Sequence, residues 1–147
     1  MTLSYINVMA ILKKQLQSYL NEEFKNINLT SSEIFLLHNL YKNGDKTQIE
    51  IARNIECDKA HIHRITIKLI EKDLIKYIDN NDHIKNQKLS LTNKGTIFAN
   101  QINQIFIKWR DKLLQGIDKK DLEIAKTVIE QLVANSYKIN VSEKNNA

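Results

Sequence analysis

The stretch that decides the fold runs from residue 47 to residue 91. It opens with Thr47-Gln48-Ile49-Glu50-Ile51-Ala52, breaks at a few polar residues, resumes as Asp58-Lys59-Ala60-His61-Ile62-His63-Arg64, and closes with Lys88-Leu89-Ser90-Leu91. Thr47 and Glu50 have the spacing of a helix-capping box, and Asp58 is a typical N-cap residue. Two short helices are therefore predicted, at 47–54 and 58–72.

A β-hairpin is predicted directly after these two helices. Two segments with interspersed apolar residues, 74–78 and 87–91, flank the polar turn Asn80-Asn81-Asp82, which is the pattern of two strands joined by a loop. Two short helices followed by a hairpin form the plan of a winged helix-turn-helix. The second helix of that plan is the one suited to the DNA major groove.

Longer helices are predicted on the N-terminal side of this stretch. Apolar residues recur at three- and four-residue steps over about 3–24, which indicates an amphipathic helix. A second helix begins after Thr30, which forms another capping-box pattern with Glu33, and ends at Gly44.

Two more helices are predicted after the hairpin, from Thr92 to about Leu114 and from Asp118 to about Asn135. The 147 residues include no proline and three glycines, so few residues break helices. The expected fold class is mainly α with a small β-hairpin wing, a winged helix-turn-helix whose N- and C-terminal helices form a dimerisation region.

One domain is expected over residues 1–137, followed by a polar tail at 138–147. Within it lie a helix-turn-helix motif at 47–70, a wing at 74–91, and dimerisation helices at about 3–24 and 93–135. The apolar stripes of these outer helices exceed what the DNA-reading core needs, so a second copy of the chain is the expected partner. The alternative is that they fold back on the same subunit.

Charge and composition narrow the class of protein. The net charge is +5 and the pI is near 9.2, which suits a nucleic-acid partner but also fits an ordinary basic protein. The single cysteine forms no intrachain disulfide, and the first residues lack a signal-peptide pattern, so a cytoplasmic location is expected. No apolar run is long enough to predict a membrane span.

Motifs for catalysis are missing from the sequence. It contains no Gly-rich phosphate loop, no His-Glu-x-x-His and no nucleophile elbow, so neither an enzyme nor a cofactor is expected.

The chain resembles the MarR family of bacterial transcription regulators over roughly residues 4–134. The residues that carry the resemblance are Leu29-Thr30, Thr47-x-x-Glu50-Ile51-Ala52, Ile62-x-Arg64-Ile65, Leu69-Ile70-Glu71-Lys72-Asp73-Leu74-Ile75, Leu89-Ser90-Leu91-Thr92-Asn93-Lys94-Gly95 and Gly116-Ile117-Asp118. The most specific is Leu-Thr-x-Lys-Gly between the hairpin and a long helix. Their order and separations, taken together, make the signal strong.

The resemblance implies a homodimer that binds double-stranded DNA at an imperfect palindrome. It implies a recognition helix in the major groove, a wing at the minor groove, and an effector, often a small anionic compound or an oxidant, that loosens DNA binding. The candidate DNA contacts are Thr47, Gln48, Lys59, Ala60, His61, His63, Arg64, Lys68, Lys85, Asn86 and Lys88. For Arg64 and Lys68 the alternative is simple solvation at the surface.

The chain departs from the family pattern in three ways. Asp73 stands where the family usually has glycine, at a position that tends to need positive φ. His83 and Lys85 replace an Asp-x-Arg pair in the wing, so a bidentate guanidinium is exchanged for a point charge. Ile67 and Ile70 stand where the family is usually polar, which predicts partial exposure or local repacking.

The histidines and the cysteine each allow a functional and a structural interpretation. His61 and His63 point about 200° apart on a helix and cannot chelate one ion together, so no metal site is expected. Cys57 precedes the cap of the second helix and is either a reactive thiol or a small buried hydrophobe. His38 is either a weak candidate for effector binding or a core histidine with a satisfied ring.

The sequence therefore predicts a sequence-specific DNA-binding transcriptional regulator, a repressor whose DNA binding is modulated by a small effector. Two alternatives remain open: a winged-helix protein-interaction module without DNA binding, and a thiol- or metal-sensing regulator.

Overall fold

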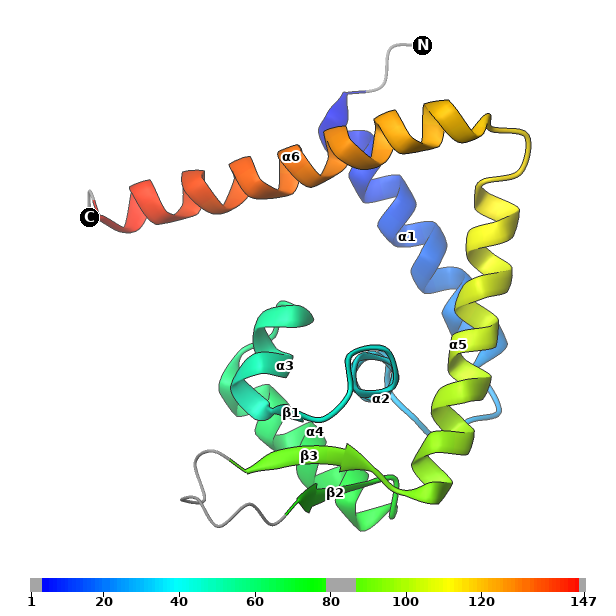
Figure 1. The fold of residues 1–147 in the computed structure, drawn as a ribbon, viewed down its shortest axis with the longest axis vertical. Coiled ribbons are helices and arrows are strands. Elements are labelled where there is room, and N and C mark those ends of the chain that lie inside the picture. Colours follow the sequence, from blue (N-terminus) through cyan, green and yellow to red (C-terminus); the bar gives the residue numbers. More distant parts are fainter. Residues whose placement is uncertain (1–3, 79–86, 146–147) are drawn as a thin grey trace. The chain divides into compact units, whose positions relative to one another are not determined.

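The structure is a computed structural model that describes residues 4–78 and 87–145, with side chains described as far as residue 139. Its elements are, in order, α1 (Tyr5–Glu23), α2 (Ser31–Asn43), β1 (Lys46–Thr47), α3 (Gln48–Asn54), α4 (Lys59–Glu71), β2 (Ile75–Ile78), β3 (Lys88–Leu91), α5 (Asn93–Leu113) and α6 (Lys119–Asn145) (Figure 1). Six helices and one small antiparallel sheet, over these residues, confirm the predicted mainly α fold. The chain divides into two compact units, residues 1–109 and 110–147.

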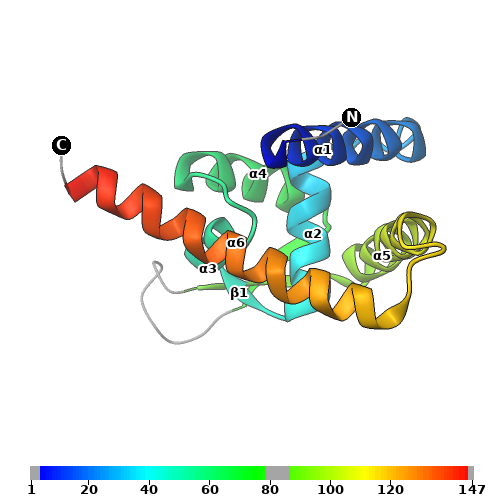
Figure 2. The same ribbon diagram turned by 90° about the horizontal axis from the view of Figure 1, so that it is seen from above.

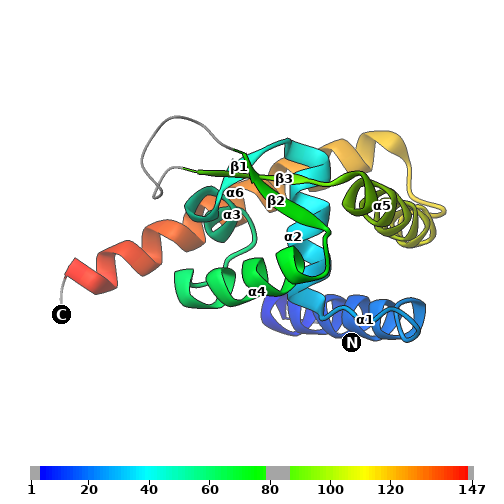
Figure 3. The same ribbon diagram turned by 90° about the horizontal axis from the view of Figure 1, so that it is seen from below.

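In the first unit, α2 runs through the centre. Figure 1 shows α2 nearly end-on, with α3 and α4 on one side, α5 on the other and the sheet below, and Figure 3 shows the same arrangement from the sheet side. The core is made of aliphatic side chains from all of these helices and from the sheet, including Leu36, Leu37, Ile51, Ile62, Leu69, Ile75, Leu89 and Ile102. On α2, Ile34 and Leu37 are buried, and Tyr41 is half-buried.

The predicted helix caps are confirmed. Thr30 and Thr47 each form a complete capping box, in which the threonine hydroxyl accepts from the amide three residues on and the glutamate accepts from the threonine amide. Asp58 Oδ1 accepts from the His61 amide at 2.8 Å, and Thr92 Oγ1 accepts from the Gly95 amide at 2.9 Å.

The sheet has one more strand than predicted. Its order is β1-β3-β2, with β1 antiparallel to β3 so that Lys46 lies opposite Leu89 and Thr47 opposite Lys88. Two residues are too few for an alternation of apolar and polar side chains, so the sequence carries no periodic signal for β1. This strand ties the start of α3 directly to the wing.

The junction between α4, the wing and α5 is held by backbone contacts. Asp73 has φ of 57°, which confirms the positive φ expected there. Thr92 Oγ1 donates to the Asp73 carbonyl at 2.7 Å, and Lys94 Nζ donates to the Lys72 carbonyl at 2.9 Å. A Cβ at Gly95 would lie 1.8 Å from the Leu74 carbonyl oxygen, so the close approach of α5 to this turn requires glycine.

An ion pair between a buried glutamate and a half-buried lysine joins α2 to the end of α4. Glu33 is 1% exposed, and its Oε1 accepts from Lys72 Nζ at 3.0 Å, while the same ammonium donates to the Asn28 carbonyl at 2.9 Å. Burial by itself raises the pKa of Glu33, but the hydrogen bond from the Thr30 amide and the hydrogen bond and charge of Lys72 outweigh it, so this pKa lies below its ordinary value.

Helix α1 has two halves with different surroundings. Near its C-terminal end, Leu20 is buried and Leu16 and Tyr19 pack against the core, as does Phe24 beyond the helix. The first half exposes large apolar side chains: Tyr5, Ile6, Val8, Met9, Ile11 and Leu12. The apolar stripe predicted for this helix is therefore only partly used within the subunit.

In the second unit, α6 continues to Asn145. The predicted helix end near Asn135 is therefore wrong, as is the polar tail over 138–145. Those residues include neither glycine nor proline, so nothing in them stops a helix. The helix exposes a series of large apolar side chains: Ile124, Val128, Ile129, Leu132, Val133, Tyr137 and Ile139. Over the described residues, no helix has the length and apolar character needed to cross a membrane.

Candidate nucleic-acid interface

Helix α4 has one buried face and one basic exposed face. Ile62, Ile65 and Leu69 are buried, and the helix packs on α2, α3 and β2. The residues on the exposed face are Lys59, Ala60, His63, Arg64, Ile67, Lys68 and Glu71. Figure 2 shows α4 at the edge of the first unit. Five of the predicted DNA-contact residues thus share one surface: Lys59, Ala60, His63, Arg64 and Lys68.

His61 lies apart from that surface. Its ring is half-buried, and Nε2 lies 3.0 Å from Ser32 Oγ near the start of α2, while Nδ1 lies 3.5 Å from Arg64 Nη2. A histidine between a helix terminus and an arginine holds α4 to α2 and restrains the arginine. These contacts favour a positioning role for His61 over direct contact with a base.

The start of α3 lies beside the wing. The hydroxyl and amide of Thr47 are both used in the capping box with Glu50. Gln48 Nε2 donates to Tyr77 Oη at 2.8 Å, which connects α3 to strand β2. Tyr77 was not among the predicted site residues. Its only signal in the sequence is an aromatic residue in a short strand, which is too common to single it out.

Several positively charged side chains lie close to α3. Lys46, Glu50, Arg53 and Asn54 line a cleft of about 220 Å³. The hydrogen bond from the Thr47 amide, followed by the charges of Lys46 and Lys88, holds the pKa of Glu50 below its ordinary value. Lys88 is exposed on β3 beside Thr47. It therefore adds positive charge near the N-terminus of α3. Lys85 and Asn86, together with His83, lie outside the described residues.

His38 sits in a structured environment on α2. Its Nε2 is 3.2 Å from Asn103 Oδ1, and its ring centroid is 4.6 Å from that of Phe106. Burial lowers the pKa of His38, and the charge of Lys42 lowers it further, against the raising effect of the Asn103 bond. The neutral ring is favoured, so these contacts support the core-histidine reading over an anion-binding one.

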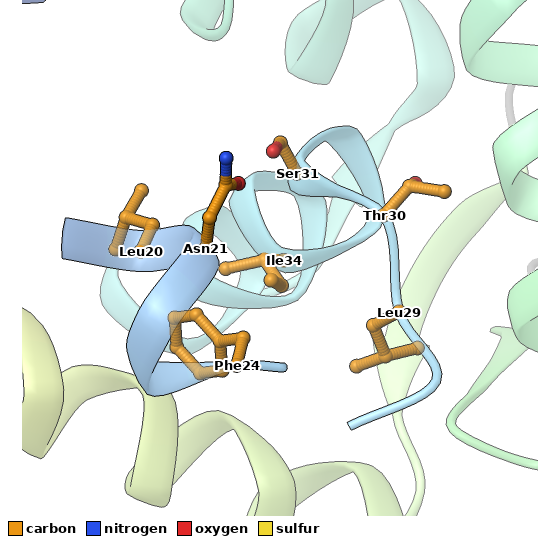
Figure 4. Close-up of a pocket in the computed structure, with 7 residues that line it drawn as sticks. All are labelled: Leu20, Asn21, Phe24, Leu29, Thr30, Ser31 and Ile34. Atoms are coloured by element: carbon orange, nitrogen blue, oxygen red, sulfur yellow. The ribbon is translucent and has the colours of Figure 1, made fainter. Parts of the chain in front are cut away.

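A concave site lies between α1 and α2 (Figure 4). Its volume is about 300 Å³, and its lining residues are Leu20, Asn21, Phe24, Leu29, Thr30, Ser31 and Ile34. Gln17 Nε2 donates to both Asn21 Oδ1 and Ser31 Oγ at 2.8 Å, so the polar rim is ordered. The open surface of this cleft is more polar than apolar, with fixed polar groups of the kind that orient a small molecule.

Cys57 and the histidines form no cluster in the described part of the chain. Cys57 is half-buried and packs against the hydrophobic core, which favours the small-hydrophobe reading. Over the same residues, no group of three or more His, Cys, Asp or Glu side chains is placed to hold a metal ion.

Comparisons with known proteins agree on one family. The model of the MarR family matches residues 29–86. The HTH-type transcriptional regulator BilQ of Clostridioides difficile is 29% identical over 136 residues, covering 92% of this chain and 86% of that protein.

Solved structures share the fold. A MarR family transcriptional regulator from Listeria monocytogenes, complexed with 26mer DNA, has a TM-score of 0.83 at 20% identity, covering 91% of this chain and 89% of that one. MepR of S. aureus, in a DNA complex, has a TM-score of 0.79 at 16% identity, covering 91% of this chain and 99% of that one. By the matched segment, the similar regulator and the common fold, the chain is similar to the MarR family of winged helix-turn-helix transcription regulators.

Proposed function

We propose that this protein is a cytoplasmic, sequence-specific DNA-binding regulator whose α4 enters the major groove. The observation that carries the proposal is the two-sided character of α4. Its buried side packs on α2 and α3, whereas its exposed side presents Lys59, His63, Arg64 and Lys68 with no acidic residue before Glu71. Cationic side chains on an exposed helix can neutralise phosphates and read guanine edges.

The surroundings of α4 supply further contacts to the DNA backbone. The N-terminus of α3 carries Thr47 and Gln48, and Lys46 and Lys88 lie close to it. Backbone contacts of this kind fix the orientation of the protein, while base contacts specify the sequence. We assign Thr47, Gln48 and Lys88, with Lys85 and Asn86 of the wing, to the backbone, and Arg64 to a base edge.

A homodimer is part of the proposal. The exposed apolar side chains of α1 and α6 are suited to a second copy of the chain. Two symmetry-related α4 helices would then read two half-sites of an imperfect palindrome, roughly 10 bp or a multiple of it apart.

The Arg64→Ala variant tests the role of α4. Its affinity for a DNA fragment selected from a genomic pool is measured over a series of salt concentrations. We expect a loss of about 1–3 kcal/mol and a relaxed sequence preference if Arg64 contacts a base edge. Arg110→Ala is the matched control, because it removes the same charge from α5 at a side chain already paired with Asp111. Equal effects of both variants, or no retained fragment with the parent protein, would contradict the proposal; the latter outcome would favour a protein-interaction module.

We also propose that the regulator is a repressor released by a small effector, and that the cleft between α1 and α2 receives it. Its concave shape and ordered polar rim support this. A thermal-shift screen of small organic anions tests whether the cleft binds an effector. The screen is repeated with Leu20→Trp, which fills the cleft. A compound that shifts both proteins equally binds elsewhere.

A further inference from the structure

Ile67 occupies the middle of the face that α4 presents to DNA. At roughly 100° per residue, Ile67 lies within about 20° of Ala60 and about 60° of Arg64 around the helix axis. The buried residues Ile62 and Leu69 lie on the opposite side. Ile67 is 44% exposed, so an isoleucine side chain points outward from the recognition surface.

The surroundings of Ile67 are cationic. Arg64 and Lys68 flank it on one side of the exposed face, and His63 flanks it on the other, one turn back. A single exposed isoleucine is ordinary on a protein surface. Ile67, however, lies among cationic side chains that attract phosphate. When these side chains bring α4 into the groove, Ile67 contacts base edges instead of water.

We propose that Ile67 reads the 5-methyl groups of thymine in the major groove, and so sets an A·T preference within each half-site. An aliphatic side chain offers no hydrogen bond, and thymine is the only base whose major-groove edge carries a methyl group. The proposal rests on the proposed DNA-binding function and adds a specificity-determining residue to it.

Ala60 extends the same apolar strip. It is exposed, seven residues before Ile67, and therefore about 10 Å away along the helix axis. That length covers about three base pairs at a rise of 3.4 Å. A half-site read by both residues carries thymines about three base pairs apart, with the Arg64 contact between them.

Replacement of each operator thymine in turn by deoxyuridine tests the inference, because it removes the methyl group and nothing else. The operator is a fragment retained by the full-length protein. We expect the parent protein to lose affinity about four-fold at the contacted thymine, the effect of losing one buried methyl-sized group. Ile67→Ala should bind the thymine and deoxyuridine operators equally at that position. The variant should fold, because the side chain is exposed and alanine favours helix.

Ile49→Ala is the matched control. Ile49 is 39% exposed on α3, away from the exposed face of α4, so this variant should keep the full deoxyuridine penalty whatever its own affinity. Two results overturn the inference while leaving DNA binding intact: a parent protein indifferent to deoxyuridine at every position, or a penalty that persists in Ile67→Ala. If the parent retains no specific fragment at all, the proposed function fails as well.

Discussion

Gly95 fixes the junction between the wing and α5 by lacking a side chain. A Cβ there would meet the Leu74 carbonyl oxygen at 1.8 Å, and a backbone atom cannot swing away as a flexible side chain can. We expect Gly95→Ala to lower the free energy of unfolding by about 3 kcal/mol, the upper range for a forced backbone shift. Denaturant unfolding followed by circular dichroism measures this.

Gly116→Ala is the control for a change of glycine to alanine. Gly116 has φ of 80° but open space around it, so its substitution costs only the penalty for positive φ, about 1 kcal/mol. If both variants lose the same stability, the close contact at Gly95 has no energetic consequence.

Single residues also show what the sequence could and could not reveal. The caps at Thr30, Thr47 and Asp58 were predictable because each uses atoms within three residues along the chain. The bond between Gln48 and Tyr77 joins residues 29 apart, and the Glu33–Lys72 pair spans 39. Such contacts form only when the helices and strands have packed together, so no local sequence pattern predicts them.

Among the elements, α2 and α4 are tied by the Glu33–Lys72 pair, which makes this contact sensitive to acid. The pKa of Glu33 is lowered in the folded protein, so its stabilisation is complete above the unfolded value of about 4.5 and is lost as pH falls through the lower folded pKa. Glu33→Gln keeps the cap of α2 but removes the charge. We expect it to lose about 1–2 kcal/mol near neutral pH.

The pH series distinguishes the ion pair from a simple hydrogen bond. The difference in unfolding free energy between the parent and Glu33→Gln should shrink as the pH is lowered from about 5 to 3. A difference that stays constant over that range would show that the charge of Glu33 does not contribute.

The Gln48–Tyr77 bond connects α3 to β2, and a double-mutant cycle measures it. Because both side chains are partly exposed, we expect Tyr77→Phe and Gln48→Ala to couple by only about 0.5–1 kcal/mol in unfolding free energy. Tyr41→Phe removes the hydroxyl that donates to Asn100, and it should add to Gln48→Ala without coupling. Coupling near zero for Tyr77 as well would mean that this bond does not persist in solution.

At the level of elements, the sequence located the starts of α2 to α6, because capping residues mark them, but it placed the start of α1 at about Leu3 instead of Tyr5. It misplaced the end of α6, where polar residues without glycine or proline continue the helix to Asn145. Helical spacing alone placed six predicted DNA-contact residues on one face of α4, and five of them are exposed there. It did not foresee that the ring of His61 lies at Ser32, since that requires the position of α2.

For the whole molecule, the exposed apolar side chains of α1 and α6 predict an assembly larger than one chain. We expect sedimentation at micromolar concentration to give twice the 17.2 kDa of the single chain. Leu132→Glu should dissociate it by placing a charge in the apolar face of α6. Thr127→Glu places the same charge roughly 140° away around the helix and should leave the assembly intact. A folded 17.2 kDa species from the parent protein would contradict this.

The spacing of the two half-sites tests most directly whether a two-fold dimer reads DNA through paired α4 helices. Affinity is measured for the selected operator and for the same operator with about five base pairs inserted at its centre, which turns one half-site to the opposite side of the duplex. We expect the insertion to reduce binding to the level of unrelated DNA, and an insertion of about ten base pairs to restore part of it. Equal affinity for the original operator and the operator with about five added base pairs would show that α4 does not read paired half-sites.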